Sequence, residues 1–414
     1  WSSDVCSSDL FQQTNVVSSY LEEGIGGVTE LFKNRVVLPF EGEYNKFRHV
    51  IHHELVHAVL NDMFYGGSIQ SIITNNITLQ LPIWFNEGLA EYEALRWDTN
   101  SDMFLRDATT HEYLPEIDQL NGYFAYRGGQ SLWWFIAERY GDEKIADILH
   151  HIRGTKSVET GLRSAIGLGI DELSERWQKE QKKIYWPDIS MRQEPEEYSR
   201  RLTDHKKESN FYNTSPAINP QGDKIAFISD RSDYFDVYIM SAIDGQIREK
   251  LISGQRTPDF EELHLLTPGM SWSPEGERLA VTAKSGERDA IILINVKEGD
   301  EEKISFDLDG IFSVDWSPNG KQLAFVGNRG KQSDIFVYDL ETKSLSNLTD
   351  DIFTDEDPSW SKDGSTIFFS SDRSSFVGKK NIPDGFKMQA YDFSQLDLYS
   401  INVSRGEKIG RAHV

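Results

Sequence analysis

The chain has 414 residues, more than one hydrophobic core usually organises, so we expect two or more domains. Its 38% hydrophobic and 27% charged residues are typical of globular proteins. The formal net charge of −24 argues against a surface for nucleic acid or anionic lipid, because such surfaces depend on clustered Lys and Arg. The sequence has no run of about 18 apolar residues, so we expect no transmembrane segment.

The amino-acid sequences of the two chain ends can come from one stretch of DNA. The segments DVCSSDL (4–10) and KIGRAHV (408–414) can be encoded by opposite strands of one DNA segment, with a match at all seven positions. That DNA resembles a sequencing-library adapter. We therefore expect residues 1–10 and 408–414 to be adapter-derived ends of a metagenomic-type fragment, outside the natural fold. The only cysteine, Cys6, lies in the first of these ends, so we expect no disulfide.

Residues 11–187 have the pattern of an α+β domain. Two short strands with a turn between them are expected at GIGGVTE (24–30) and NRVVLPF (34–40). The apolar spacing of the next segment, 45–64, predicts a helix. Its residues available for burial are Val50, Leu55, Val59 and Leu60.

This expected helix carries HHELVH, which matches the H-E-x-x-H pattern. His53 and His57 are four residues apart, so they project from one helix face within reach of one metal ion. Glu54 lies about 100° round the helix from His53, where its carboxylate can act on a water molecule at the metal. A rival pair, His49 and His53, has the same spacing but lacks the glutamate that follows. The pattern predicts zinc ligands at His53 and His57 and a general base at Glu54.

A catalytic zinc ion takes three protein ligands, and the next candidate lies in WFNEGLAEY (84–92), inside a second expected helix at 81–97. Together with H-E-x-x-H, this segment resembles the gluzincin metallopeptidases, such as the aminopeptidase-N-like enzymes. The resemblance implies that Glu87 is the third zinc ligand and that Glu91 accepts a hydrogen bond from a ligating histidine. The 29 residues between His57 and Glu87 exceed the gap in aminopeptidase N. The domain as a whole resembles the shorter peptidase-MA-like domains.

The same resemblance implies peptide-bond hydrolysis, in which Glu54 takes a proton from the attacking water and returns it to the leaving amine. The developing oxyanion needs a further hydrogen-bond donor. Tyr126 is the first candidate and Tyr123 the second, although both could equally be packed aromatic residues of the core. Gly26 and Gly27 are expected on a strand edge that pairs with an extended peptide substrate, or else in a turn.

The rest of this region predicts more helices and then a break. Two helices that meet near Gly141 are expected in 128–154, and an amphipathic helix in 169–186. From Pro187 onward the composition becomes polar and charged. We therefore expect residues 188–210 to be a linker.

After the linker the chain repeats itself. Four segments align at turn glycines that are 54, 44 and 44 residues apart, namely Gly222, Gly276, Gly320 and Gly364. In each unit a hydrophobic strand follows the turn, and a second strand follows the first. A period near 44 residues with several strands per unit is typical of β-propeller blades rather than of a β-sandwich. We expect an all-β propeller over 211–407 with four blades, and an insertion at about 375–395 in the fourth.

Two features of these repeats resemble the propeller family of TolB, a protein of the bacterial Tol–Pal envelope system. They are the W-S-P-x-G turns at Trp272–Gly276 and Trp316–Gly320, and the S-D-R-S segments that begin at Ser229 and Ser371. Because that family usually closes its ring with more blades, the propeller in this fragment is expected to be incomplete. The resemblance implies a periplasmic or cell-envelope location and an envelope protein partner at the propeller.

The sequence thus predicts a multidomain protein, with an α+β zincin-like (gluzincin) domain followed by an all-β TolB-like propeller. The expected function is zinc-dependent peptide-bond hydrolysis in the bacterial cell envelope, on a peptide or protein substrate, with the propeller binding a partner or controlling access. The alternative is a TolB-like protein-binding scaffold with a structural or weakly active zinc site. Glu54 favours the enzyme, because a purely structural zinc site has no use for a general base.

Overall fold

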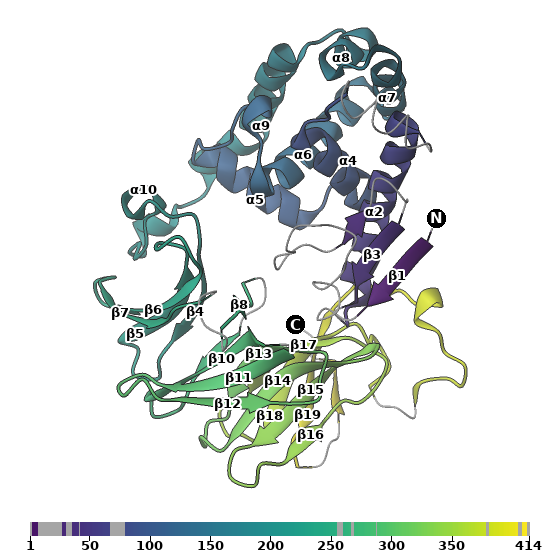
Figure 1. Ribbon diagram of the computed structural model, residues 1–414. Coiled ribbons are helices and arrows are strands. Elements are labelled where there is room, and N and C mark those ends of the chain that lie inside the picture. Colours follow the sequence, from purple (N-terminus) through teal and green to yellow (C-terminus); the bar gives the residue numbers. More distant parts are fainter. Residues whose placement is uncertain are drawn as a thin grey trace.

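The computed structural model describes residues 2–6, 27–29, 35–40, 42–66, 79–254, 260–265, 269–286, 288–377, 381–404 and 408–411. A helical N-terminal domain lies over one end of a row of twisted antiparallel sheets (Figure 1). Within the described residues, no helix is both long and apolar enough to cross a membrane. The predicted order, a mixed N-terminal domain followed by an all-β region, is confirmed.

The small sheet of the N-terminal domain has the order β1-β3-β2. Strand β2 (Val28–Thr29) pairs antiparallel with β3 (Arg35–Pro39), as expected for two short strands joined by a turn. Strand β1 (Ser2–Cys6) pairs in parallel with the other edge of β3, although we expected residues 1–10 to lie outside the natural fold. An open strand edge pairs through its backbone groups and places few demands on sequence. The pairing is therefore compatible with an adapter-derived segment, whose origin stays a prediction.

Helices make up most of the other described residues of this domain. They are α2 (Tyr44–Tyr65), α4 (Ile83–Leu95), α5 (Thr99–Thr110), α6 (Gly122–Tyr140), α7 (Glu143–Thr155), α8 (Val158–Ile166) and α9 (Ile170–Met191). Their apolar faces enclose one core that includes the fully buried Trp133 and Trp177. Gly88 of α4 lies directly against the backbone of Gly129 in α6, with no room for a side chain at either position. This close approach fixes α4 and α6 relative to each other, and both carry site residues.

Helix α2 buries a different face from the predicted one. Leu60 is buried as expected and Val50 partly so, but Leu55 and Val59 are 48% and 61% exposed. The buried stripe instead runs through His53, His57, Leu60 and Phe64. The prediction for Leu55 and Val59 was wrong because the face that carries the histidines is the one covered by α4 and the small sheet.

Helix α9 is longer than predicted and continues through Pro187 to Met191. Its last turn is held to the domain by an ion pair between Asp188 and Arg106 of α5. The first residues of the expected linker 188–210 are therefore helical. The short helix α10 (His205–Glu208) lies farther along the linker, and Leu202 packs against the first sheet of the second domain.

The second domain contains four consecutive antiparallel sheets, with the strand order expected of propeller blades. Blade 1 holds β4 (Asn213–Ile218), β5 (Lys224–Ser229), β6 (Asp236–Ser241) and β7 (Ile247–Ile252). Blade 2 holds β8 (Glu262–Leu263), β9 (Met270–Trp272), β10 (Arg278–Ser285), β11 (Arg288–Asn295) and β12 (Glu301–Ser305). Blade 3 holds β13 (Gly310–Trp316), β14 (Gln322–Arg329), β15 (Gln332–Asp339) and β16 (Leu345–Asn347). Blade 4 holds β17 (Asp355–Trp360), β18 (Thr366–Ser371), β19 (Asp397–Asn402) and β20 (Lys408–Arg411).

The sheets do not close into a ring, in agreement with an incomplete propeller. Strand β20 lies in the second segment expected to be adapter-derived and pairs with the edge of β19.

The four turn glycines have nearly the same conformation. Their φ angles are 73°, 73°, 74° and 71° for Gly222, Gly276, Gly320 and Gly364. In every blade the glycine N–H donates to the carbonyl of the residue three positions earlier, at 2.8–2.9 Å. This backbone conformation is open to glycine and costly for other residues, which explains why the repeat is visible in the sequence.

The two domains touch where α2 begins (Figure 1). The Gly42 carbonyl accepts a hydrogen bond of 3.1 Å from the Thr354 hydroxyl, and the Tyr44 ring lies 5.8 Å from the Phe393 ring of the blade 4 insertion. Lys46 Nζ lies 3.4 Å from Glu356 Oε1 of β17. The start of the helix that carries the H-E-x-x-H residues is therefore held against the propeller.

Candidate metal and catalytic site

Three side chains from two helices converge in the N-terminal domain. His53 and His57 project from α2, and their Nε2 atoms lie 3.0 Å apart. Glu87 projects from α4 and places its Oε2 atom 3.1 Å from each Nε2. The two histidines are buried, and the side chain of Glu87 is 20% exposed. The structure thus brings together the three residues that the sequence predicted as metal ligands.

The electrostatics of the group follow from these contacts. Burial alone would lower the pKa of His53, but its hydrogen bond to Glu87, its close contact with Glu91 and the negative charges nearby outweigh burial and raise that pKa to about 9. Burial alone would raise the pKa of Glu87, but the two histidines outweigh it and lower the pKa to about 2. Glu87 is therefore a carboxylate at neutral pH, and a metal ion that binds here takes the place of a proton on His53.

Each domain is similar to a known protein family. Residues 8–183 match the family model of the Peptidase MA superfamily. The N-terminal domain is a Peptidase MA domain. Residues 260–382 match the model of the TolB beta propeller domain, so the second domain is a TolB-like propeller, as predicted. No curated protein matches the chain.

Two solved TolB structures are similar to about half of the chain. A TolB candidate from Agrobacterium tumefaciens has a TM-score of 0.36 and 18% identity, with 46% of this chain and 62% of that chain covered. TolB from Acinetobacter baumannii has a TM-score of 0.35 and 21% identity, with 48% of this chain and 42% of that chain covered. The chain thus spans less than two thirds of either structure.

The donor set of the Peptidase MA domain fits a divalent ion such as zinc. Two imidazole nitrogens and one carboxylate oxygen are a common ligand set for catalytic zinc. Ligand atoms at about 2.0–2.1 Å from one ion lie roughly 3.3 Å apart in a tetrahedral arrangement. The three donor atoms here lie 3.0–3.1 Å apart. The Nδ1 atom of His57 is buried and makes no hydrogen bond within the described part of the chain.

Glu54 lies on the same buried side of α2, next to the small sheet. The Thr29 hydroxyl of β2 donates to Glu54 Oε2 at 2.6 Å and lies 3.2 Å from the Glu54 carbonyl oxygen. Gly27 lies just before β2, where a Cβ atom would come within 2.6 Å of Glu54 Cγ and 2.9 Å of Glu54 Oε1. Gly27 therefore makes room for Glu54, and its role in substrate binding stays a prediction. Gly26, predicted with it, lies outside the described residues.

Tyr126 of α6 lies over the metal-ligand group. Its ring is stacked on that of His53, with centroids 6.0 Å apart and planes 15° apart, and it is 36% exposed. Burial, together with the charges of Glu87 and Glu54, raises the pKa of Tyr126, so its hydroxyl stays protonated at neutral pH. Tyr123, the second candidate, is 45% exposed, and its hydroxyl accepts a bond of 3.0 Å from Arg127 Nε.

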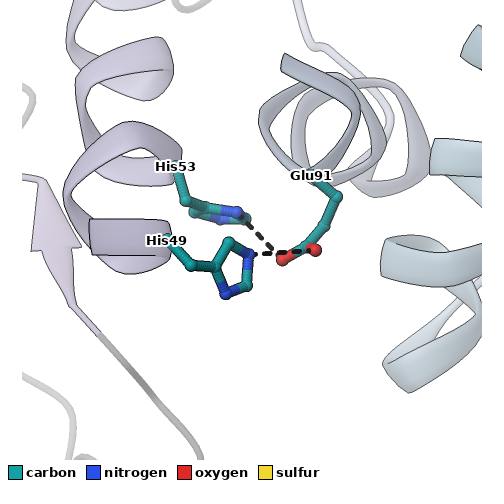
Figure 2. A group of neighbouring side chains, drawn as sticks. All are labelled: His49, His53 and Glu91. Carbon is teal, nitrogen blue, oxygen red and sulfur yellow. Dashed lines mark hydrogen bonds and ion pairs between the residues drawn. The ribbon is translucent and has the colours of Figure 1, made fainter. Parts of the chain in front are cut away.

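Glu91 lies behind His53, one helical turn from Glu87 on α4. Its Oε1 atom is 3.1 Å from His53 Nδ1, so the predicted partners are close, but the contact has no hydrogen-bond geometry, and the predicted hydrogen bond stays a prediction. Figure 2 shows His49 and His53 approaching Glu91 from successive turns of α2. The rival pair His49 and His53 is thus close in space, and Glu91 joins it to form a second group.

Two contact residues were not identified from the sequence. Thr29 contacts Glu54, and nothing in the pattern of a two-residue strand marks that contact. Arg127 contacts Glu91, and here a signal was present. It is the only charged residue in the small and apolar run YFAYRGGQSLWWFIA (123–137), and an arginine buried in such a helix needs an acidic partner.

Proposed function

We propose that this protein is a zinc-dependent metallopeptidase of the bacterial cell envelope. The observation that carries the proposal is the convergence of His53, His57 and Glu87 within 3.1 Å of one another, beside Glu54, in a Peptidase MA domain. The envelope location rests on the likeness of the second domain to TolB propellers. A propeller held against the start of α2 would bind a protein partner or limit which substrates reach the site.

In this proposal His53, His57 and Glu87 hold the zinc ion. When bound, zinc lowers the pKa of a water molecule to about 7 and polarises a substrate carbonyl. Glu87 is already ionised at neutral pH, so its carboxylate is ready to serve as a ligand. Glu91 places its Oε1 atom 3.1 Å from Nδ1 of His53, which favours a proton on Nδ1 and leaves Nε2 of that ring for the ion.

Glu54 is the proposed general base. Its carboxylate takes the proton of the attacking water and later gives it to the leaving amine. The Thr29 hydroxyl occupies Oε2, so the other oxygen, Oε1, is the one available for proton transfer. Gly27 lies next to Oε1, and the edge of β2 that does not pair with β3 can align an extended peptide beside it.

Tyr126 is the proposed donor to the developing oxyanion. It is half-exposed beside His53 and keeps its hydroxyl proton, so it can donate a hydrogen bond to negative charge. Replacing Tyr126 with Phe should lower kcat by about 10²–10³-fold and leave zinc affinity within a factor of about two. Similar kcat values for the variant and the wild type would exclude this role and leave Tyr126 as a packing residue.

The proposal is tested by zinc stoichiometry and peptide cleavage on the full chain. We expect about one zinc per wild-type chain, a strong loss of zinc in Glu87→Ala, and full zinc with no cleavage in Glu54→Gln. A wild type that folds without binding zinc would overturn the proposal. Cleavage by Glu54→Gln at the wild-type rate would exclude the mechanism. Zinc binding without cleavage of any peptide in a random library would favour the scaffold alternative.

A further inference from the structure

Two groups of possible metal ligands share His53. The first is His53, His57 and Glu87, and the second is His49, His53 and Glu91 (Figure 2). His53 faces the first group with Nε2 and the second with Nδ1. The second group differs from the first because a fixed cation is already present in it: the Arg127 guanidinium, with Nη1 3.0 Å from Glu91 Oε2.

We propose that Arg127 is a positioning residue of the zinc site, which it serves by fixing Glu91 against His53. The inference rests on the proposed function, since it concerns the same zinc site. Arg127 touches neither the three proposed ligands nor Glu54 in any described contact. It acts through Glu91, whose two carboxylate oxygens have separate partners.

The division of the Glu91 carboxylate is the first argument. Its Oε2 atom lies 3.0 Å from Arg127 Nη1 and 3.2 Å from His49 Nε2. Its Oε1 atom lies 3.1 Å from His53 Nδ1. With Oε2 held by two groups, the carboxylate cannot rotate freely, so Oε1 stays directed at His53. The orientation of the His53 ring, and with it the direction of Nε2, then depends on the donors at Oε2.

The anchoring of Arg127 itself is the second argument. Its side chain is 13% exposed, and Nη1 also donates to Ser101 Oγ and to Gln130 Oε1, both at 3.2 Å. Its Nε atom donates to the Tyr123 hydroxyl at 3.0 Å. Gln130 is fully buried and is fixed in turn by a bond of 3.0 Å to the carbonyl of Arg96. The guanidinium is therefore held from several directions and provides a rigid support for Glu91.

Charge is the third argument. Glu91 is 5% exposed, and a buried carboxylate needs a compensating cation. The guanidinium supplies that positive charge permanently, since arginine does not lose its proton in proteins. A metal ion in the second group would share Oε2 with this guanidinium and would require His53 to bind two ions through its two nitrogens. The geometry therefore favours support of one zinc site over a second site.

The experiment measures zinc affinity in the full chain by competition with a chromogenic chelator. We expect Arg127→Met to bind zinc about 10-fold more weakly than the wild type, within the range known for groups that orient a metal ligand. Arg127→Lys keeps the positive charge but lacks the planar set of N–H donors of the guanidinium. Its zinc affinity should therefore lie between those of the wild type and Arg127→Met. The matched control is Arg163→Met, because Arg163 lies on a helix surface and its ion pairs among the described residues are with the exposed Glu159 and Glu172.

A double-mutant cycle separates positioning from general destabilisation. In the Glu91→Gln background, Arg127→Met should cause no further loss of zinc affinity, because its effect passes through Glu91. The absorption spectrum of the cobalt-substituted protein should change in Arg127→Met and not in Arg163→Met. The melting temperature of each metal-free variant shows whether the domain still folds.

The outcomes distinguish this inference from the proposed function. A wild type without zinc would overturn both. Zinc affinity and a cobalt spectrum in Arg127→Met equal to those of Arg163→Met would overturn the role of Arg127 and leave the proposed function intact. Two zinc ions per wild-type chain, one of them lost in His49→Ala, would also overturn it, because the second group would then be a metal site.

Discussion

Helix α2 and the blade strands differ in which side chains they bury. In β15 the buried residues Ile335, Phe336 and Val337 are apolar, and the buried Asp334 before them accepts hydrogen bonds from side chains of its own blade. In α2 the buried stripe includes two histidines and a glutamate, while Leu55 and Val59 face outward. Polar groups are stable in an interior only with partners. A helix that buries polar residues and exposes apolar ones is therefore one in which a functional site, and not core packing, determines the buried face.

The largest expected effect tests which face of α2 is buried. Leu60→Ala removes a side chain that is 2% exposed and should lower the free energy of unfolding by about 2–5 kcal/mol. Val59→Ala removes one that is 61% exposed and should change it by less than about 0.5 kcal/mol. Urea unfolding followed by far-UV circular dichroism at a helix band measures both. Equal losses of unfolding free energy in the two variants would mean that Val59 is as buried as Leu60, as the apolar spacing of α2 predicted.

The second prediction concerns the small sheet that covers α2. Gly27→Ala places a methyl group against Glu54 Cγ and Leu38 Cδ2, so Glu54 must move. We expect kcat to fall about 10–100-fold with zinc content unchanged, because a shift of about 1 Å in a catalytic group has effects of this size. Gly154→Ala is the control, since a Cβ there meets nothing within 4 Å. If Gly27→Ala instead raised KM alone, Gly27 would act in substrate binding.

The sequence predicted local features better than contacts between elements. His53 and His57 lie one turn apart on one helix, and Glu87 and Glu91 lie one turn apart on another. The shared face of each pair could therefore be predicted from the sequence of a single helix. The blades repeat one turn at one φ, which made them visible from four glycines. Arg127 contacts Glu91 across 36 positions and Thr29 contacts Glu54 across 25. Such pairs depend on how elements pack, and no local pattern encodes that.

The third prediction tests the repeated turn in the propeller. Gly222→Ala adds a Cβ with nothing within 4 Å, so its cost is only that of a φ of 73°, roughly 1 kcal/mol. Gly276→Ala has the same φ and also displaces Gln221, whose Nε2 donates to the Glu275 carbonyl at 2.9 Å. Gly276→Ala should therefore destabilise the propeller more. Thermal unfolding followed at a β-sheet band measures both variants, and equal losses of stability would mean that the contact between blades 1 and 2 adds nothing.

The smallest effect lies where the two regions meet, at Glu43 before α2. Glu43 is 8% exposed, and burial together with the neighbouring Glu356 raises its pKa to about 8, against the opposing effect of Lys46. An unfolded glutamate has a pKa near 4.5. Folding therefore favours protonated Glu43, and this contribution is fully present below pH 4.5 and is lost as the pH rises through about 8. The contact between α2 and the propeller should weaken over that range.

Glu43→Gln isolates this contribution, because the amide stays neutral at every pH and has nearly the same shape as the protonated acid. Between pH 6 and pH 9 the melting temperature of the wild type should fall more than that of Glu43→Gln. The Lys46 and Glu356 pair is kept in both proteins, so the difference between the two curves belongs to Glu43. Parallel curves would mean that Glu43 is ionised in the folded protein and that Lys46 compensates its burial. The domain contact would then depend on ion pairs and would weaken with added salt instead of with rising pH.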